Sequence, residues 1–187
     1  MPISFPPASQ DPIIRLHDYY FQACDLMFDN TENLLFLFEN NGKLSQKKIV
    51  DLQSYLQLWL ATLYVVAEVF QSKKVTTFFE KLELTDDDPD NITLRTHWHS
   101  IRHMFRQLGS ELKSYRHITF HFQESSDRIK TKRASFLDYD GRHRPIDWAR
   151  ELHKEMRLFF GMYRSFSAAL HMHKQWLMEL SNPHQDV

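Results

Sequence analysis

The chain has 187 residues, of which 42% are hydrophobic and 14% aromatic. This composition supplies a sizeable core for one domain and excludes an intrinsically disordered protein. The single cysteine, Cys24, excludes an internal disulfide framework, and no uninterrupted apolar run reaches the length of a membrane span. The N-terminus lacks the positively charged segment and the following apolar run that are typical of a secretion signal. We therefore predict a cytoplasmic protein that does not bind a membrane.

Charge is divided unevenly along the chain. Residues 1–90 carry 7 Lys and Arg against 14 Asp and Glu, a balance of −7. Residues 91–187 carry 16 against 10, a balance of +6, together with ten of the 11 histidines. A basic, histidine-rich half suits an anionic ligand, and the acidic half would then face elsewhere or face a basic partner. Packing of the two halves against each other explains the asymmetry equally well.

The first half of the chain contains two helical patterns after a proline-bearing tail, residues 1–12. Apolar residues recur at helical spacing from Ile13 through Leu16, Tyr20, Ala23 and Met27 to Phe38, and Asn40-Asn41-Gly42 is a typical helix end. A second pattern begins after Ser45, a favourable N-cap residue. It runs without interruption from Ile49 to Phe70.

Two further helical patterns follow in the second half. The acidic segment 85–91 predicts a solvated loop and a helix start rather than a metal site, because acids are favoured just before a helix. One pattern then runs from Leu94 to Tyr115, and another starts near Pro145 and continues to Leu180. Residues 123–144 have no periodicity and predict a basic loop. We expect an all-α, up-and-down bundle of four or five helices, with one domain at 13–180 and a C-terminal tail at 181–187.

The segment 115–122 contains the residues best suited to chemistry on a phosphodiester. Arg116 precedes His121 by five residues, and these two residue types can hold a phosphate and move a proton at neutral pH. On a continuous helix, residues five apart lie about 140° apart around the axis. A working pair therefore predicts that the helix ends or bends after Tyr115, which the β-branched and aromatic residues 118–120 favour.

Arg116-His117-x3-His121 resembles the Arg-polar-x3-His element of HEPN domains, the "higher eukaryotes and prokaryotes nucleotide-binding" superfamily. Those domains are all-α bundles that carry the element near a helix junction late in the domain. Many of them have Asn after the arginine, where this chain has His117.

The resemblance implies a metal-independent endoribonuclease without a cofactor, acting as a toxin or defence effector. His121 would accept the proton of the ribose 2′-hydroxyl, and Arg116 would neutralise the phosphoryl oxygens. His117 would orient this pair or contact the RNA. HEPN nucleases typically pair two motifs across a homodimer, and an antitoxin or another protein would be a further partner. The alternative is a catalytically inactive HEPN-like module that binds a partner protein or a nucleotide, with Arg116 at a helix end and His121 half buried.

A second cluster lies on the predicted helix 94–115. Basic residues at helical spacing there form a face suited to a phosphate backbone or to the acidic half of the chain. Its members are Arg95, His99, Arg102, His103 and Arg106. We predict that Arg102, Arg106 and Lys113 bind the RNA substrate beside the motif. His99 and His103 have a spacing that can chelate zinc, but no glutamate completes a His-Glu-x-x-His pattern and no cysteine lies nearby, so we expect no metal. A metal-binding helical bundle that uses these two histidines is the weaker, third alternative.

Overall fold

In the computed structural model every element is a helix, and no strand occurs among the residues that the structure describes, which are 9–82, 84, 88–121 and 145–181. The elements are α1 (Pro12–Leu16), η1 (His17–Phe21), α2 (Gln22–Asn41), α3 (Gln46–Phe70), α4 (Lys73–Glu80), α5 (Pro89–His121) and α7 (Pro145–Ser181). The first three follow one another without a gap and form one long helix. The all-α prediction is therefore confirmed. The expected basic loop at 123–144 lies outside the described residues.

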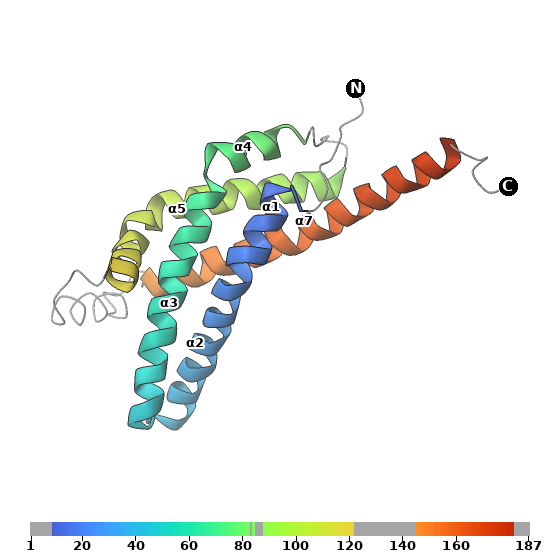
Figure 1. Ribbon diagram of the computed structural model, residues 1–187. Helices are drawn as coiled ribbons and strands as arrows, with labels where there is room; N and C mark the ends of the chain where they lie inside the picture. The colour runs from blue at the N-terminus through green and yellow to red at the C-terminus, as the bar shows by residue number, and fades with distance from the viewer. Residues whose placement is uncertain (1–8, 83, 85–87, 122–144, 182–187) are drawn as a thin grey trace.

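The helices alternate in direction but do not share one axis. Figure 1 shows α2 and α3 as an antiparallel hairpin, crossed near one end by the antiparallel pair of α5 and α7. Helix α3 contacts α2, α5 and α7, so it is the central element. The short helix α4, which the sequence analysis did not anticipate, packs against α1 and α3. The other end of the α2–α3 hairpin extends away from the crossing helices (Figure 1).

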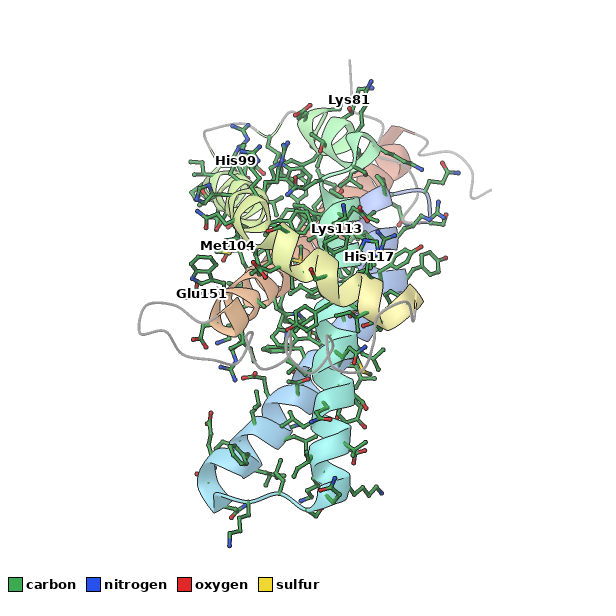
Figure 2. The ribbon with its side chains drawn as sticks, turned by 90° about the vertical axis from the view of Figure 1, so that its left-hand side faces the viewer. Lys81, His99, Met104, Lys113, His117 and Glu151 are labelled. Carbon is green, nitrogen blue, oxygen red and sulfur yellow. The ribbon has the colours of Figure 1, made fainter. Side chains whose placement is uncertain are left out.

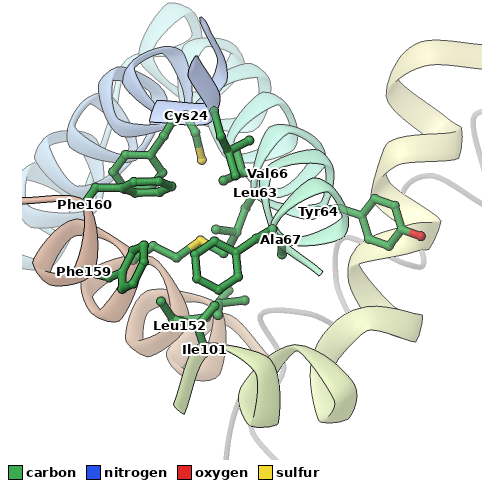
Figure 3. Close-up of a cluster of buried hydrophobic side chains, with 14 of the residues drawn as sticks. Cys24, Leu63, Tyr64, Val66, Ala67, Ile101, Leu152, Phe159 and Phe160 are labelled. Atoms are coloured by element: carbon green, nitrogen blue, oxygen red, sulfur yellow. The ribbon is translucent and has the colours of Figure 1, made fainter. Parts of the chain in front are cut away.

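The core lies where the hairpin and the crossing pair meet. Figure 3 shows Leu63 and Val66 of α3 facing Leu152 and Phe159 of α7 within this cluster. Aromatic rings continue it towards α4, because Trp98 stacks on Phe79 with ring centroids 4.2 Å apart. Each large apolar side chain that is fully buried contributes roughly 1.5–3 kcal/mol. From Leu56 to Phe70 the apolar pattern of α3 is thus explained by burial against three neighbouring helices, whereas Ile49, where the pattern begins, is 37% exposed.

The first helix departs from its expected register. The pattern predicted Tyr20 and Ala23 in the core, but Tyr20 is 50% exposed and the buried residues are instead Phe21 and Cys24. The cause is η1, a π-helical turn that holds one residue more than an α-helical turn. Before this turn the prediction is correct, because Ile13 and Leu16 are buried. After it, the buried face is displaced by one residue.

Helix ends use local caps that were partly readable from the sequence. Gly42 adopts a left-handed conformation (φ 64°) and its N–H donates to the Phe38 carbonyl, and Ser45 caps α3. Asp88 accepts a hydrogen bond from the Asp90 N–H at the start of α5. The predicted helix start after the acidic loop is therefore confirmed, whereas residues 85–87 lie outside the described part.

The N-terminal boundary differs slightly from the expected one. Asp11 is fully buried, caps α1 through hydrogen bonds from the N–H groups of Ile13 and Ile14, and accepts the Tyr163 hydroxyl at 2.7 Å. Pro12 is the first residue of α1. The ordered fold thus begins before residue 13, because Asp11 anchors the first helix to α7.

The prediction that the third helix ends or breaks after Tyr115 is wrong. Helix α5 continues to His121. It bends earlier, between Met104 and Lys113, as Figure 2 shows. That interval contains the Gly109-Ser110 pair, a common cause of helix kinks, and the Phe105 ring lies 3.4 Å from the place of a Cβ on Gly109. The bend therefore precedes the Arg116–His121 segment instead of dividing it.

Ion pairs join the two oppositely charged halves of the chain. In each pair an acid from residues 1–90 meets an arginine from residues 91–187. The pairs are Asp18–Arg164 (2.7 Å), Asp25–Arg157 (2.6 Å), Asp29–Arg157 (2.7 Å), Glu32–Arg150 (2.8 Å) and Glu68–Arg116 (3.7 Å). Because the acids of α2 and the arginines of α7 face each other, packing between the halves accounts for much of the charge asymmetry.

Helix α3 is, among the described helices, the one whose length and apolar composition could match a membrane span. Its residues from Leu56 to Phe70 contribute many of the buried side chains at the centre of the fold. The central helix of a water-soluble protein has the same character, so this feature alone does not identify a membrane segment.

Candidate functional site

Arg116 lies at the edge of the buried face of α5 and packs on α3. Its side chain is 34% exposed, its Nη1 atom lies 3.7 Å from a Glu68 carboxylate oxygen, and its guanidinium lies over the Tyr64 ring at 5.6 Å. The Tyr64 hydroxyl donates to the same carboxylate at 3.1 Å. Burial and the neighbouring Glu68 raise the pKa of the Tyr64 phenol. Figure 3 shows Tyr64 pointing out of the core cluster towards the last part of α5.

The solvent-facing side of the last turns of α5 carries Lys113, His117 and Phe120. Lys113 and His117 are exposed, and the Phe120 side chain is 48% exposed. Figure 2 shows Lys113 and His117 along the segment that follows the bend. Their spacing of four and three residues places them on one side of the helix. An exposed aromatic ring beside basic groups is an arrangement that can contact a nucleotide base and its phosphates.

Of the candidate catalytic pair, the structure describes the side chain of Arg116, whereas the side chain of His121 lies outside the described part. Its backbone belongs to α5, one helical turn after His117. On this continuous helix, positions 116 and 121 differ by about 140° around the axis. Position 121 therefore falls within about 40° of His117, whereas Arg116 lies at the opposite edge of the exposed face and contacts Glu68 of α3. The helix does not supply the convergence of the two residues that the sequence analysis expected within one chain.

The predicted substrate-binding residues share one face of α5 in register. Counted at about 100° per residue, positions 102, 106, 113 and 117 fall within about 60° of one another before the bend is considered. Arg106 is exposed, and Arg102 is half buried over the Trp98 ring at 5.8 Å. Arg95, His99 and Arg102 line a groove of about 280 Å³ beside α4. The basic face expected on this helix is therefore present on the surface.

The zinc alternative gains no further ligand. No group of three or more His, Cys, Asp or Glu side chains suitable for a metal occurs within the described residues. His103 instead interacts with Gln107 at 3.2 Å, and His97 pairs with Glu155 of α7 at 2.8 Å. These histidines act as polar contacts within α5 and between α5 and α7.

A buried polar network around His153 was missed by the sequence analysis. His153 is fully buried, its Nδ1 atom accepts the Trp59 indole N–H at 3.2 Å, and its Nε2 atom lies 2.8 Å from Asp25. Its ring is stacked between Phe21 and Phe28. Because an indole can only donate, Nδ1 carries no proton and Nε2 donates to Asp25. The helical pattern of α7 gave no signal for this role, since His153 lies beside the apolar positions and its partners are more than 90 residues away.

The network contains a cysteine beside a histidine, as a nucleophilic site does, but the pKa values of the two groups do not suit nucleophilic attack. The Cys24 sulfur lies 3.7 Å from Nδ1 of His153. Burial raises the pKa of the Cys24 thiol to about 12, so the thiolate needed for nucleophilic attack is not formed at neutral pH. Burial also lowers the pKa of His153, outweighing the hydrogen bond to Asp25. Hydrogen bonds from His153 and Arg157 lower the pKa of Asp25 although its partial burial acts in the opposite direction. The cluster is a structural tie between α2, α3 and α7.

Comparisons of this chain with models of protein families, with curated proteins and with solved structures found no match. The function of the protein is therefore inferred from the residues of α5 and from their surroundings.

Proposed function

We propose that this protein is a HEPN-type, metal-independent endoribonuclease that cleaves RNA at the last turns of α5, as a homodimer. Arg116 would hold the phosphate and His121 would act as the base, with Lys113 and His117 binding the RNA beside them. Arg102 and Arg106 would extend the contact along α5. A role as a toxin or defence effector is part of the same proposal and rests on the resemblance alone.

The observation that best supports this proposal is the exposed, basic character of the helical turns that contain the motif. The turns that contain it carry two exposed basic residues, Lys113 and His117, and the exposed ring of Phe120. Histidine titrates near neutral pH, so it can take the 2′-hydroxyl proton without a metal. A guanidinium can neutralise the charge that develops on the phosphoryl oxygens.

Arg116 would exchange its present partner for the phosphate. Its distance of 3.7 Å from Glu68 is longer than a hydrogen bond, and both side chains are partly exposed. Ion pairs of this kind contribute little to stability, roughly 0–1 kcal/mol. A phosphate approaching Arg116 would therefore displace Glu68 at small cost.

The alternative is a catalytically inactive HEPN-like helical module that binds a partner protein or a nucleotide. The contact of Arg116 with Glu68 and Tyr64 favours it, because such a contact also serves to attach α5 to α3. The continuous course of α5 favours it as well, since one chain does not bring positions 116 and 121 together. This module would not cleave RNA.

The decisive experiment is cleavage of bulk RNA in the presence of EDTA. We expect cleavage by the wild type and a loss of roughly 100-fold or more for His121→Ala, the usual range for removal of a general base. Gln107→Ala is the matched control, since it removes an exposed polar side chain of the same helix outside both the motif and the basic face. Wild-type protein that binds RNA but does not cleave it would replace the nuclease with the inactive module.

A second substitution separates the two roles of Arg116. Glu68→Gln removes the competing carboxylate but leaves Arg116 and Tyr64 in place. We expect tighter RNA binding and faster cleavage from Glu68→Gln, and the opposite from Arg116→Ala. If Arg116 only attaches α5 to α3, both variants would lower thermal stability slightly and neither would change RNA binding.

A further inference from the structure

The π-helical turn η1 places two tyrosines on the surface of the fold. Tyr19 is 70% exposed and Tyr20 is 50% exposed, whereas Phe21, the next residue, is buried. The Arg15 guanidinium lies over the Tyr19 ring at 5.8 Å. A π turn interrupts the regular helix at some cost and is often retained at functional sites. Here its effect is to exchange a buried tyrosine position for two adjacent exposed rings.

Three lysines lie beside these tyrosines on α4 and just after it. Lys73, Lys74 and Lys81 are exposed and line a shallow groove of about 590 Å³ together with Phe78. A second groove of about 180 Å³ is lined by Arg15, Tyr19 and Tyr20 as well as by Lys74. Both grooves are lined by Pro12 and Lys74, so they lie next to each other. We call this the tyrosine–lysine surface, consisting of Arg15, Tyr19, Tyr20, Lys73, Lys74 and Lys81.

The charge of this surface is not neutralised by the acids near it in sequence. Asp11 is buried and bound to Tyr163, and Asp18 is paired with Arg164. Glu80 of α4 lines a different groove, the one that contains Arg95 and Arg102. None of the three lysines has an ion-pair partner within the described part of the chain. A net positive surface thus lies inside the acidic half, where the charge of residues 1–90 predicts the opposite sign.

We propose that the tyrosine–lysine surface binds single-stranded RNA, with bases stacked on Tyr19 and Tyr20 and phosphates held by the lysines. Exposed rings beside a basic groove are the arrangement by which proteins hold a single strand with little sequence preference. The concave shape fits a strand better than it fits the flat surface of a bilayer. This binding is separate from cleavage at α5 and does not depend on it.

The test uses a probe that the protein cannot cleave. Binding of a fluorescein-labelled 2′-O-methyl oligouridine of about 12 nucleotides is measured by anisotropy between roughly 50 and 200 mM salt. In the variant K73Q/K74Q/K81Q we expect roughly tenfold weaker binding. The slope of log affinity against log salt should fall by about 2, or roughly 0.7 for each lost phosphate contact.

The matched control is K43Q/K47Q/K48Q. It also removes three exposed lysines, but at the turn between α2 and α3, far from α4 in Figure 1. We expect its affinity and salt slope to stay near those of the wild type. Circular dichroism of each variant checks that the helices are intact.

The tyrosines are tested separately from the charge. Tyr19→Ala and Tyr20→Ala should each weaken binding roughly fivefold or more by removing a stacked base, with the salt slope unchanged. Tyr20→Phe keeps the ring and should bind like the wild type. Because the probe lacks a reactive 2′-hydroxyl, a failure of RNA cleavage does not affect these results.

Three outcomes would overturn the proposal: wild-type protein that does not bind the probe, equal losses in the two triple-lysine variants, or binding that is unaffected by both alanine substitutions. A fourth concerns the surface's ligand. In this outcome, vesicles containing phosphatidylserine bind the wild type but not the K73Q/K74Q/K81Q variant, while the oligonucleotide binds neither protein. The surface then recognises a membrane instead.

Discussion

His153 shows how a single residue can join three helices without taking part in chemistry. Its Nδ1 atom accepts a hydrogen bond from the indole N–H of Trp59 of α3, and its Nε2–H donates to Asp25 of α2. Protonation of Nδ1 would break the first contact, and burial penalises the charged ring. Both effects favour the neutral form, which agrees with the lowered pKa of His153.

The neutral state of His153 predicts loss of stability in mild acid. In the unfolded chain His153 takes up a proton near its ordinary pKa of 6.5, whereas in the folded chain it does so only at lower pH. Its contribution to stability is therefore complete above about pH 6.5 and is lost as the pH falls towards the folded pKa, by at most ~1.4 kcal/mol per pH unit. Urea denaturation from about pH 7.5 to about pH 5 measures this slope, and His153→Gln should flatten it.

Trp59→Phe provides a second variant should His153→Gln fail to fold. It keeps an aromatic ring in the core but frees Nδ1 of His153 to accept a proton, so the folded-state pKa of His153 should rise towards its ordinary value. The pH-dependent loss should therefore stop at a higher pH and be smaller than in the wild type. If all three proteins had the same pH slope, other titrating groups would be responsible and the assignment to His153 would be wrong.

At the scale of elements, helical patterns located most of the helices, and local chemistry located several of their ends. Gly42, Ser45 and Asp88 act at helix ends as their residue types indicate. The short α4 was missed because eight residues carry too little periodicity. The π turn was missed for a different reason. An α-helical count through residues 13–38 fits the sequence well, and only contacts with α3 and α7 decide that Phe21 and Cys24, not Tyr20 and Ala23, are buried.

This register shift predicts the outcome of deleting one residue. Without Tyr20, the residues that are now buried at 21, 24 and 28 would follow Ile13 and Leu16 at regular α-helical spacing. The deletion should therefore convert η1 into an α-helical turn and keep the same side chains in the core. We expect a thermal midpoint equal to or above that of the wild type, because the π turn is removed.

The same deletion should weaken oligonucleotide binding, since one exposed ring is lost and Tyr19 is reoriented. Deletion of Gln22, just after the turn, offers a comparison that also removes one residue but keeps both tyrosines. A marked fall in the melting temperature of the Tyr20 deletion would show that η1 stabilises the fold instead of serving the surface.

At the scale of the whole molecule, the sequence anticipated the helical class and a basic face on α5 but not the geometry of the motif. The uneven distribution of charge left two interpretations open, an anionic ligand or packing of the two halves against each other. A sum over 90 residues does not distinguish them, because it does not show which acids are already paired. The structure pairs Asp25, Asp29 and Glu32 with arginines of α7. The bend of α5 was likewise placed too late, after Tyr115, although the Gly109-Ser110 pair was visible. The β-branched and aromatic residues 118–120 predict a bend within the motif itself, but the bend occurs before the motif, in the interval that contains Gly109-Ser110.

Because α5 holds positions 116 and 121 on different sides, the proposed nuclease requires a second chain. A two-fold axis beside the end of α5 would bring Arg116 of one protomer to His121 of the other, and it would repeat this site twice. It would also join two basic faces into one groove. Sedimentation at micromolar concentration should therefore show a dimer, and a strict monomer would favour the inactive module.

Mixing two inactive variants tests this composite site directly. Arg116→Ala and His121→Ala should each be inactive alone. After random exchange of subunits, half of the dimers would be mixed, and in each of these one of the two sites would combine an intact Arg116 with an intact His121. About a quarter of the wild-type RNA cleavage should then return. If the pair acted within one chain, or if each site needed both copies of both residues, the mixture would stay inactive although each variant still formed dimers.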